Sequence, residues 1–297
     1  MPGRESGPYG IAAGSDGALW VTLARSGGVA RLGTDGEVTV HGLGAPDVRP
    51  TVITAGPDGA LWCTLNQADA ITRVTVTGEV TSYPLPTPGS APYGIASGPD
   101  GALWFTAMNT DRVGRITVDG VVTEFPLPVT GAYPSVITAG PDGALWCTLN
   151  QADALARVTV TGDVTLYPLP TTGAGPVGIA SDGEAVWFVE IVAGRVGRIT
   201  VTGDLREFPL PDRAAKPHAI VARGPGDCWF TEWGTGRVGR IRGDGTVTEY
   251  DLPSPSPSPS PSPASSPSSE PHGIAVGPDG ALWVALESGS VARVEAR

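Results

Sequence analysis

One short phrase recurs seven times along this chain, and its spacing constrains the fold more than any other feature. Each copy contains Ala-Leu-Trp or a close variant, with the tryptophan at Trp20, Trp62, Trp104, Trp146, Trp187, Trp229 and Trp283. The intervals between these tryptophans are 42, 42, 42, 41, 42 and 54 residues. Self-similarity at a period of this length is typical of propellers and other repeat folds. The fold is therefore expected to consist of seven similar units.

Each unit has the pattern of four short strands separated by tight turns. In the third copy, runs rich in β-branched and aromatic residues occupy 92–96, 102–106, 112–117 and 121–125. Asp-Gly pairs, which favour hairpin turns, separate several of these runs. No segment carries a helical period of useful length, and a β-solenoid would need shorter repeats. The sequence predicts an all-β, seven-bladed β-propeller with four-stranded blades.

We expect a single propeller domain over 1–297, with one irregular blade. The long last interval contains a Ser/Pro-rich run at 254–269, predicted to be an extended loop inserted between blades 6 and 7. The chain ends at the third strand of the seventh unit, and only residues 1–7, which are poor strand material, precede the first unit. Blade 7 is therefore expected to have a short or missing outer strand.

Charge and composition narrow the classes of partner. The formal net charge is −11 and the only lysine is Lys216. Nucleic acids and anionic membranes need clustered basic residues, so we expect neither as a partner. No apolar run approaches 18 residues and no signal-peptide pattern is present, so we expect a cytoplasmic protein, and a monomer. Cys63, Cys147 and Cys228 lie next to tryptophans without C-x-x-C spacing, which predicts small buried hydrophobic residues.

Functional residues are sought where the seven copies differ. The residue two before the isoleucine of the opening phrase is Tyr9, Thr51, Tyr93, Ser135, Val177, His218 and His272 in turn. In a propeller this phrase begins the innermost strand, so these seven side chains are expected to ring one end of the central channel. Two of the three histidines fall in this ring, on neighbouring blades. The third, His41, is expected to be an exposed residue between strands.

Two acidic residues are found only in the seventh copy. Glu270 precedes His272 by two positions, and Glu287 follows Trp283 by four. Two carboxylates can hold a hard divalent cation such as Mg²⁺, and a histidine beside that ion can take a proton from a substrate. The competing interpretation is that such side chains are ordinary polar residues of the channel rim. This pattern alone does not name a substrate.

Several phrases together resemble the repeats of the virginiamycin B lyase (streptogramin B lyase) family over nearly the whole chain. The repeat motifs at 92–95, 103–106 and 113–116 are only weakly specific for the family. The histidine-containing motifs at 217–220 and 270–274 are much more specific. The resemblance implies a seven-bladed propeller that linearises streptogramin B antibiotics by eliminative opening of their lactone ester with Mg²⁺. It also implies a general base at His272, Mg²⁺-associated acids at Glu270 and Glu287, and a substrate-contacting histidine at His218.

The chain also departs from this family. Five blades lack the glutamate that usually follows Trp-Phe-Thr and carry Leu23, Leu65, Ala107, Leu149 and Leu286 instead. We expect this to alter packing more than chemistry. The remaining glutamates, Glu190 and Glu232, are expected to be structural or rim residues.

Two other functions remain open for this scaffold. One is a lactonase that hydrolyses its substrate with a divalent metal, and the other is a propeller that binds a partner without catalysis. Elimination would leave solvent oxygen out of the product, hydrolysis would incorporate it, and a binding propeller would show no metal dependence. The natural small-molecule substrate is not given by the residues.

Overall fold

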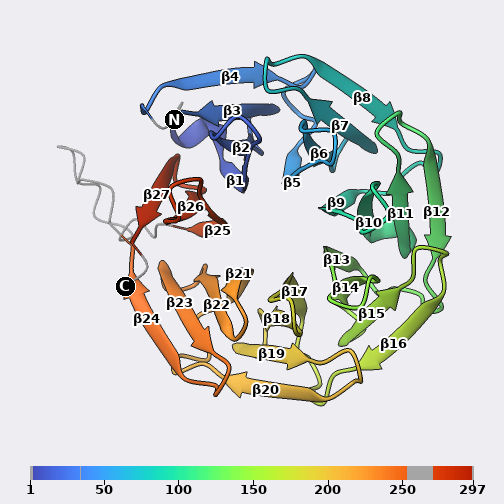
Figure 1. Ribbon diagram of the computed structural model, residues 1–297, viewed down its shortest axis with the longest axis vertical. Helices are drawn as coiled ribbons and strands as arrows, with labels where there is room; N and C mark the ends of the chain where they lie inside the picture. The colour runs from blue at the N-terminus through green and yellow to red at the C-terminus, as the bar shows by residue number, and fades with distance from the viewer. Residues whose placement is uncertain (1–2, 34, 253–269, 296–297) are drawn as a thin grey trace.

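The computed structural model describes residues 3–33, 35–252 and 270–295 of the chain. Its strands form seven sheets arranged as blades around a central axis (Figure 1), so the predicted β-propeller is confirmed. In each blade the chain runs from the innermost strand outward, and consecutive strands pair antiparallel. The Ser/Pro-rich run at 254–269 lies outside the described residues.

Among the residues that the structure describes, no long helix lies between consecutive strands. Two short 3₁₀ turns occur, η1 (Arg4–Ser6) and η2 (Met108–Thr110), and the described part of the chain has no helix long and apolar enough to span a membrane. Blades 1 to 3 comprise β1 (Pro8–Ala13), β2 (Leu19–Leu23), β3 (Gly28–Leu32), β4 (Val38–Gly42), β5 (Pro50–Ala55), β6 (Leu61–Leu65), β7 (Ala70–Val74), β8 (Val80–Pro84), β9 (Pro92–Ser97), β10 (Leu103–Ala107), β11 (Arg112–Ile116) and β12 (Val122–Pro126).

Blades 4 to 6 repeat this arrangement, and blade 7 is shorter. They comprise β13 (Pro134–Ala139), β14 (Leu145–Leu149), β15 (Ala154–Val158), β16 (Val164–Pro168), β17 (Pro176–Ser181), β18 (Val186–Glu190), β19 (Arg195–Ile199), β20 (Leu205–Pro209), β21 (Pro217–Gly224), β22 (Asp227–Glu232), β23 (Arg237–Arg242), β24 (Val247–Asp251), β25 (Pro271–Val276), β26 (Leu282–Leu286) and β27 (Ser290–Val294). Among the described residues, blade 7 has three strands and the other six have four, as expected from the sequence.

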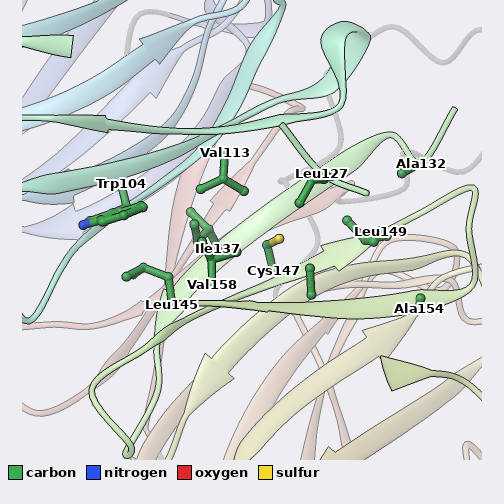
Figure 2. Close-up of a cluster of buried hydrophobic side chains, with 11 residues drawn as sticks. Trp104, Val113, Leu127, Ala132, Ile137, Leu145, Cys147, Leu149, Ala154 and Val158 are labelled. Carbon is green, nitrogen blue, oxygen red and sulfur yellow. The ribbon is translucent and has the colours of Figure 1, made fainter. Parts of the chain in front are cut away.

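The hydrophobic core is divided into clusters that lie between neighbouring blades. Figure 2 shows the cluster between blades 3 and 4, in which Trp104 of blade 3 belongs to the same buried cluster as Ile137, Leu145 and Cys147 of blade 4. All three cysteines are buried and unpaired, as predicted, and burial raises the pKa of the Cys63 thiol to about 12. Every blade thus buries its second strand against the next blade.

An aromatic side chain from the outer strand covers the repeated tryptophan in six blades. In blade 2, for example, the rings of Trp62 and Tyr83 stack with centroids 5.6 Å apart. In blade 1 the covering ring is His41, which lies on β4 and stacks on Trp20 at 5.6 Å. The expectation that His41 is simply exposed was therefore wrong, because it takes the place that tyrosine or phenylalanine takes elsewhere. Trp283 of blade 7 remains partly exposed.

A threonine hydroxyl ties most blades to the next one. Thr64 on β6 donates to the carbonyl oxygen of Tyr93 at 2.7 Å, and Thr231 on β22 donates to that of His272 at 2.9 Å. Blades 1, 3 and 4 repeat this bond, whereas blades 5 and 7 carry Val189 and Ala285 at the same position. These bonds fix the start of the inner strand of the next blade at five of the seven junctions.

Candidate functional site

The channel ring predicted from the sequence is present at the start of the seven inner strands. Each of these strands begins with a proline, and the residue before that proline has a positive φ, for example +44° at Glu270. A β-bulge follows directly: in blade 7, Pro271 pairs with Leu286 and the regular register resumes only at Ile274. Bulges re-aim side chains and are common beside active sites. This local geometry brings the ring residues to the channel mouth.

His272 and Glu287 form a hydrogen-bonded pair at this mouth. His272 Nε2 lies 2.8 Å from Glu287 Oε2, and the imidazole is buried. The hydrogen bond from His272, reinforced by Arg25, lowers the pKa of the Glu287 carboxyl to about 2. Glu287 is therefore ionised at neutral pH and accepts a hydrogen bond from the Nε2–H of His272, which orients the ring.

The other oxygen of Glu287 is held from blade 1. The Arg25 guanidinium donates from Nη2 to Glu287 Oε1 at 2.7 Å, across a separation of 262 residues in the chain. Arg25 follows β2, so this contact joins the first and last blades. The sequence comparison missed it, although the signal was available: the corresponding residues of the other blades are all uncharged, namely Gln67, Asn109, Gln151, Val192, Gly234 and Ser288.

Tyr9 of blade 1 covers one face of His272. The two rings stack with centroids 4.4 Å apart and planes 30° apart. The close approach requires Gly273, because a Cβ there would lie 2.5 Å from the Tyr9 carbonyl oxygen. Tyr9 also shares a 2.6 Å hydroxyl–hydroxyl contact with Tyr93, and burial raises the pKa of both phenols, so both stay protonated. Sequence reasoning placed Tyr9 in the ring without giving it a role.

His218 lies against the edge of His272. Their ring centroids are 4.6 Å apart at 84°, an edge-to-face arrangement. Burial, together with the neighbouring His272, lowers the pKa of His218 to about 3, so this imidazole is neutral at physiological pH. Among the described residues, neither His218 Nδ1 nor His272 Nδ1 has a hydrogen-bond partner.

Glu270 lies beside Glu287 at the ends of two paired strands. The Glu287 backbone N–H donates to the Glu270 carbonyl oxygen at 3.1 Å. Within the described residues no group of three or more His, Cys, Asp or Glu side chains is arranged to hold a metal ion. The two acidic residues that the resemblance associates with Mg²⁺ thus lie at the ends of adjacent strands.

The ring opens onto a cavity in the central channel. Its volume is about 270 Å³, and the inner strands of all seven blades contribute to its lining. Tyr9, Tyr93 and His218 line the cavity at the end nearest the site. On the outer side, Trp233 lies 6.4 Å from His272 and carries Lys216 Nζ 4.8 Å above its ring. Aromatic side chains thus surround the polar cluster on two sides.

Comparisons with known proteins identify the family of this chain. The model of the virginiamycin B lyase family matches residues 1–294. The chain belongs to the virginiamycin B lyase family. The resemblance found in the sequence is thereby confirmed, and the family is one of lyases.

Curated relatives and solved structures show the same family. A virginiamycin B lyase of Mycolicibacterium smegmatis is 54% identical over 50 residues, and one of Saccharopolyspora erythraea is 58% identical over 45 residues. These stretches span 17% and 15% of each protein compared, so the match to these two relatives is local.

The structural matches extend over the whole chain. The virginiamycin B lyase of Staphylococcus aureus superposes with a TM-score of 0.90 at 42% identity, covering 99% of this chain and 96% of that one. A catalytically inactive histidine-to-alanine variant of that enzyme, in a structure with quinupristin, gives 0.91 at 40% identity and covers 100% and 97%.

Proposed function

We propose that this protein inactivates streptogramin B-type cyclic depsipeptides by eliminative opening of their lactone ester, as a carbon–oxygen lyase. The hydrogen bond between His272 Nε2 and ionised Glu287 carries the proposal, because a carboxylate that accepts from one ring nitrogen fixes the orientation of the imidazole and leaves the other ring nitrogen to accept a proton. The family membership and the quinupristin structure of the S. aureus enzyme support the choice of substrate.

In this mechanism His272 takes the proton from a carbon that becomes part of the new double bond. The electron pair of that C–H bond forms the double bond, the ester C–O bond breaks, and the leaving group departs as a carboxylate. No water enters the product. Neutral His218, packed edge-on against His272, positions the lactone through a hydrogen bond. Tyr9 stacks on the imidazole and limits its access to solvent.

The residues present fit a magnesium ion. Mg²⁺ is commonly bound by one or two carboxylates together with waters and substrate oxygens, and Glu270 and Glu287 supply such a pair on adjacent strand ends. The low pKa of Glu287, caused by His272 and Arg25, keeps that carboxylate ionised for binding. When bound there, Mg²⁺ supplies a Lewis acid that polarises the ester carbonyl.

The first test is product analysis of a streptogramin B incubated with the purified protein, with and without EDTA. We expect an opened product of unchanged mass with altered fragmentation, no incorporation from H₂¹⁸O, and loss of activity with EDTA. A gain of one water would identify a hydrolytic lactonase instead. Unaltered antibiotic would favour a binding propeller and contradict the proposal.

Substitution of His272 tests the base directly. We expect His272→Ala to reduce turnover by at least about 10²-fold while the circular dichroism spectrum and melting temperature stay close to wild type. The matched control is His41→Tyr, which also removes one histidine but keeps a ring stacked on Trp20 as Tyr83 does in blade 2. Turnover retained in His272→Ala would remove His272 from the mechanism.

A further inference from the structure

The Glu287 carboxylate is shared between two residues from opposite ends of the chain. Its Oε2 contacts His272 and its Oε1 accepts a 2.7 Å hydrogen bond from Arg25. The Arg25 side chain is 49% exposed and that of Glu287 is 23% exposed, so the guanidinium approaches from the solvent side of the site. One oxygen of a proposed metal ligand is therefore already occupied by a cation of the protein itself.

The path of the Arg25 side chain is shaped by Gly7. Gly7 has φ +58°, but Arg49, Ala91 and Glu270 take the same backbone conformation in other blades at φ +50°, +47° and +44°. The conformation alone does not demand glycine here. A Cβ on Gly7 would lie 2.7 Å from Arg25 Cγ, so a side chain at this position would collide with the stem of Arg25. Gly7 thus leaves room for Arg25 to reach Glu287.

We propose that the cationic side chain of Arg25 competes with a divalent metal ion for Glu287 and so sets the metal affinity of the site. The inference rests on the metal role in the proposed function. A dication beside Glu287 would repel the guanidinium and would need the same oxygen. Because Arg25 is half exposed, it can move into solvent when an ion binds. It acts as a positioning residue that holds Glu287 in place when the ion is absent.

The test compares Mg²⁺ affinities of variants that change net charge equally. We expect Arg25→Gln to bind Mg²⁺ about 3- to 30-fold more tightly than wild type by isothermal titration calorimetry, because both the competition and the repulsion are removed. Arg206→Gln is the control, since Arg206 is exposed on β20 of blade 5, away from the site. It is expected to leave the affinity within twofold.

Two further variants separate charge from folding. Arg25→Lys keeps a cation and is expected to restore most of the wild-type affinity. Gly7→Ala keeps the arginine but displaces its stem, and Ala91 shows that alanine tolerates this backbone conformation. It is expected to tighten Mg²⁺ binding in the same direction as Arg25→Gln. Melting temperatures measured alongside show whether each variant is folded.

The outcomes distinguish this inference from the proposed function. Equal affinities for Arg25→Gln and Arg206→Gln overturn the role of Arg25 while leaving His272 as the base. A wild-type protein that binds no divalent ion also overturns it, whether or not lactone opening is observed. Tighter binding in Arg25→Gln, combined with no lactone opening by wild type, supports the role of Arg25 and contradicts the lyase proposal.

Discussion

At the residue scale, two blades bury a carboxyl group where four others carry leucine. Glu190 and Glu232 are inaccessible to solvent, and within the described chain neither oxygen of Glu190 has a hydrogen-bond partner. Burial, assisted by neighbouring Glu207, raises the pKa of Glu190 to about 8, and burial raises that of Glu232 to about 7. The expectation that these glutamates are structural fits their burial, whereas a place on the channel rim does not.

This burial makes the stability of the protein depend on pH. Glu190 keeps its proton in the folded state after the unfolded chain has lost it, so its contribution to folding falls as pH rises from about 4.5 to about 8. We expect Glu190→Leu, the residue found at Leu23 and Leu149, to raise the free energy of unfolding at pH 8 by on the order of 2–4 kcal/mol. Urea unfolding at several pH values measures this.

The control for this prediction is an exposed carboxyl group of the same blade. Glu184 is exposed, so Glu184→Leu is expected to leave the pH dependence of unfolding unchanged. Well below pH 4.5, the gain from Glu190→Leu is expected to be much smaller, because Glu190 is then protonated in both the folded and the unfolded state. A gain that is the same at every pH would show that the leucine stabilises by packing alone.

Residue identities in the site were predictable from the sequence, but their contacts were not. His218, His272 and Glu287 stand out because the other repeats provide an internal reference at the same positions. The contact of Arg25 with Glu287 forms only because closure of the ring brings the first and last blades together, so no local sequence pattern predicts it. The orientations of rings such as Tyr9 depend in the same way on packing between blades.

At the element scale, side chains that face each other on the second and third strands of a blade are complementary in size. Phe105 on β10 faces Gly114 on β11, and a Cβ on Gly114 would lie 2.0 Å from the phenyl ring. In blade 4 the pair at the same register is Cys147 and Ala156. Blades 5 and 6 repeat the Phe–Gly pair, and blades 1 and 7 pair valine with alanine. A large residue on one strand thus requires a small one opposite.

We expect Gly114→Ala to destabilise the protein by about 1–3 kcal/mol, because the core around Phe105 is already filled. In a Phe105→Cys background, which recreates the pair of blade 4, the same change is expected to cost much less. A double-mutant cycle by chemical denaturation gives the coupling. Additive effects would show that the two side chains do not compete for space.

The strands themselves were largely predictable because hairpin turns and alternating runs recur seven times. The repeat pattern did not predict which side chains face each other on paired strands, because this depends on the register of the sheet. Trp283 illustrates a second limit, since its partial exposure follows from the missing fourth strand among the described residues of blade 7.

At the scale of the whole molecule, the junction between blades 7 and 1 has the smallest buried hydrophobic cluster in the part of the chain that the structure describes. It contains five buried residues, against eight to eleven at the other six junctions. It also has Ala285 where Thr22, Thr64 and Thr231 supply a hydroxyl bond to the next blade. Within the described residues, the ring therefore closes at the junction with the fewest buried hydrophobic side chains.

We expect Ala285→Thr to add the missing bond to the Tyr9 carbonyl and to raise the free energy of unfolding by about 0.5–1.5 kcal/mol. Ala285→Val is the matched control, since valine has nearly the same size without the hydroxyl and occupies this position in blade 5 as Val189. Thermal and urea unfolding of both variants measure the difference. Equal stability of the two would mean that the hydroxyl finds no acceptor.

The location of the site at this junction has a consequence for how the protein becomes active. Tyr9 and Arg25 are synthesised early and His272 and Glu287 last, and the proposed site is complete only when they are in contact. A nascent or partly opened ring would carry nearly all of its blades and still leave the antibiotic intact. If the proposed site is correct, loosening of this one junction is expected to abolish activity before the other blades come apart.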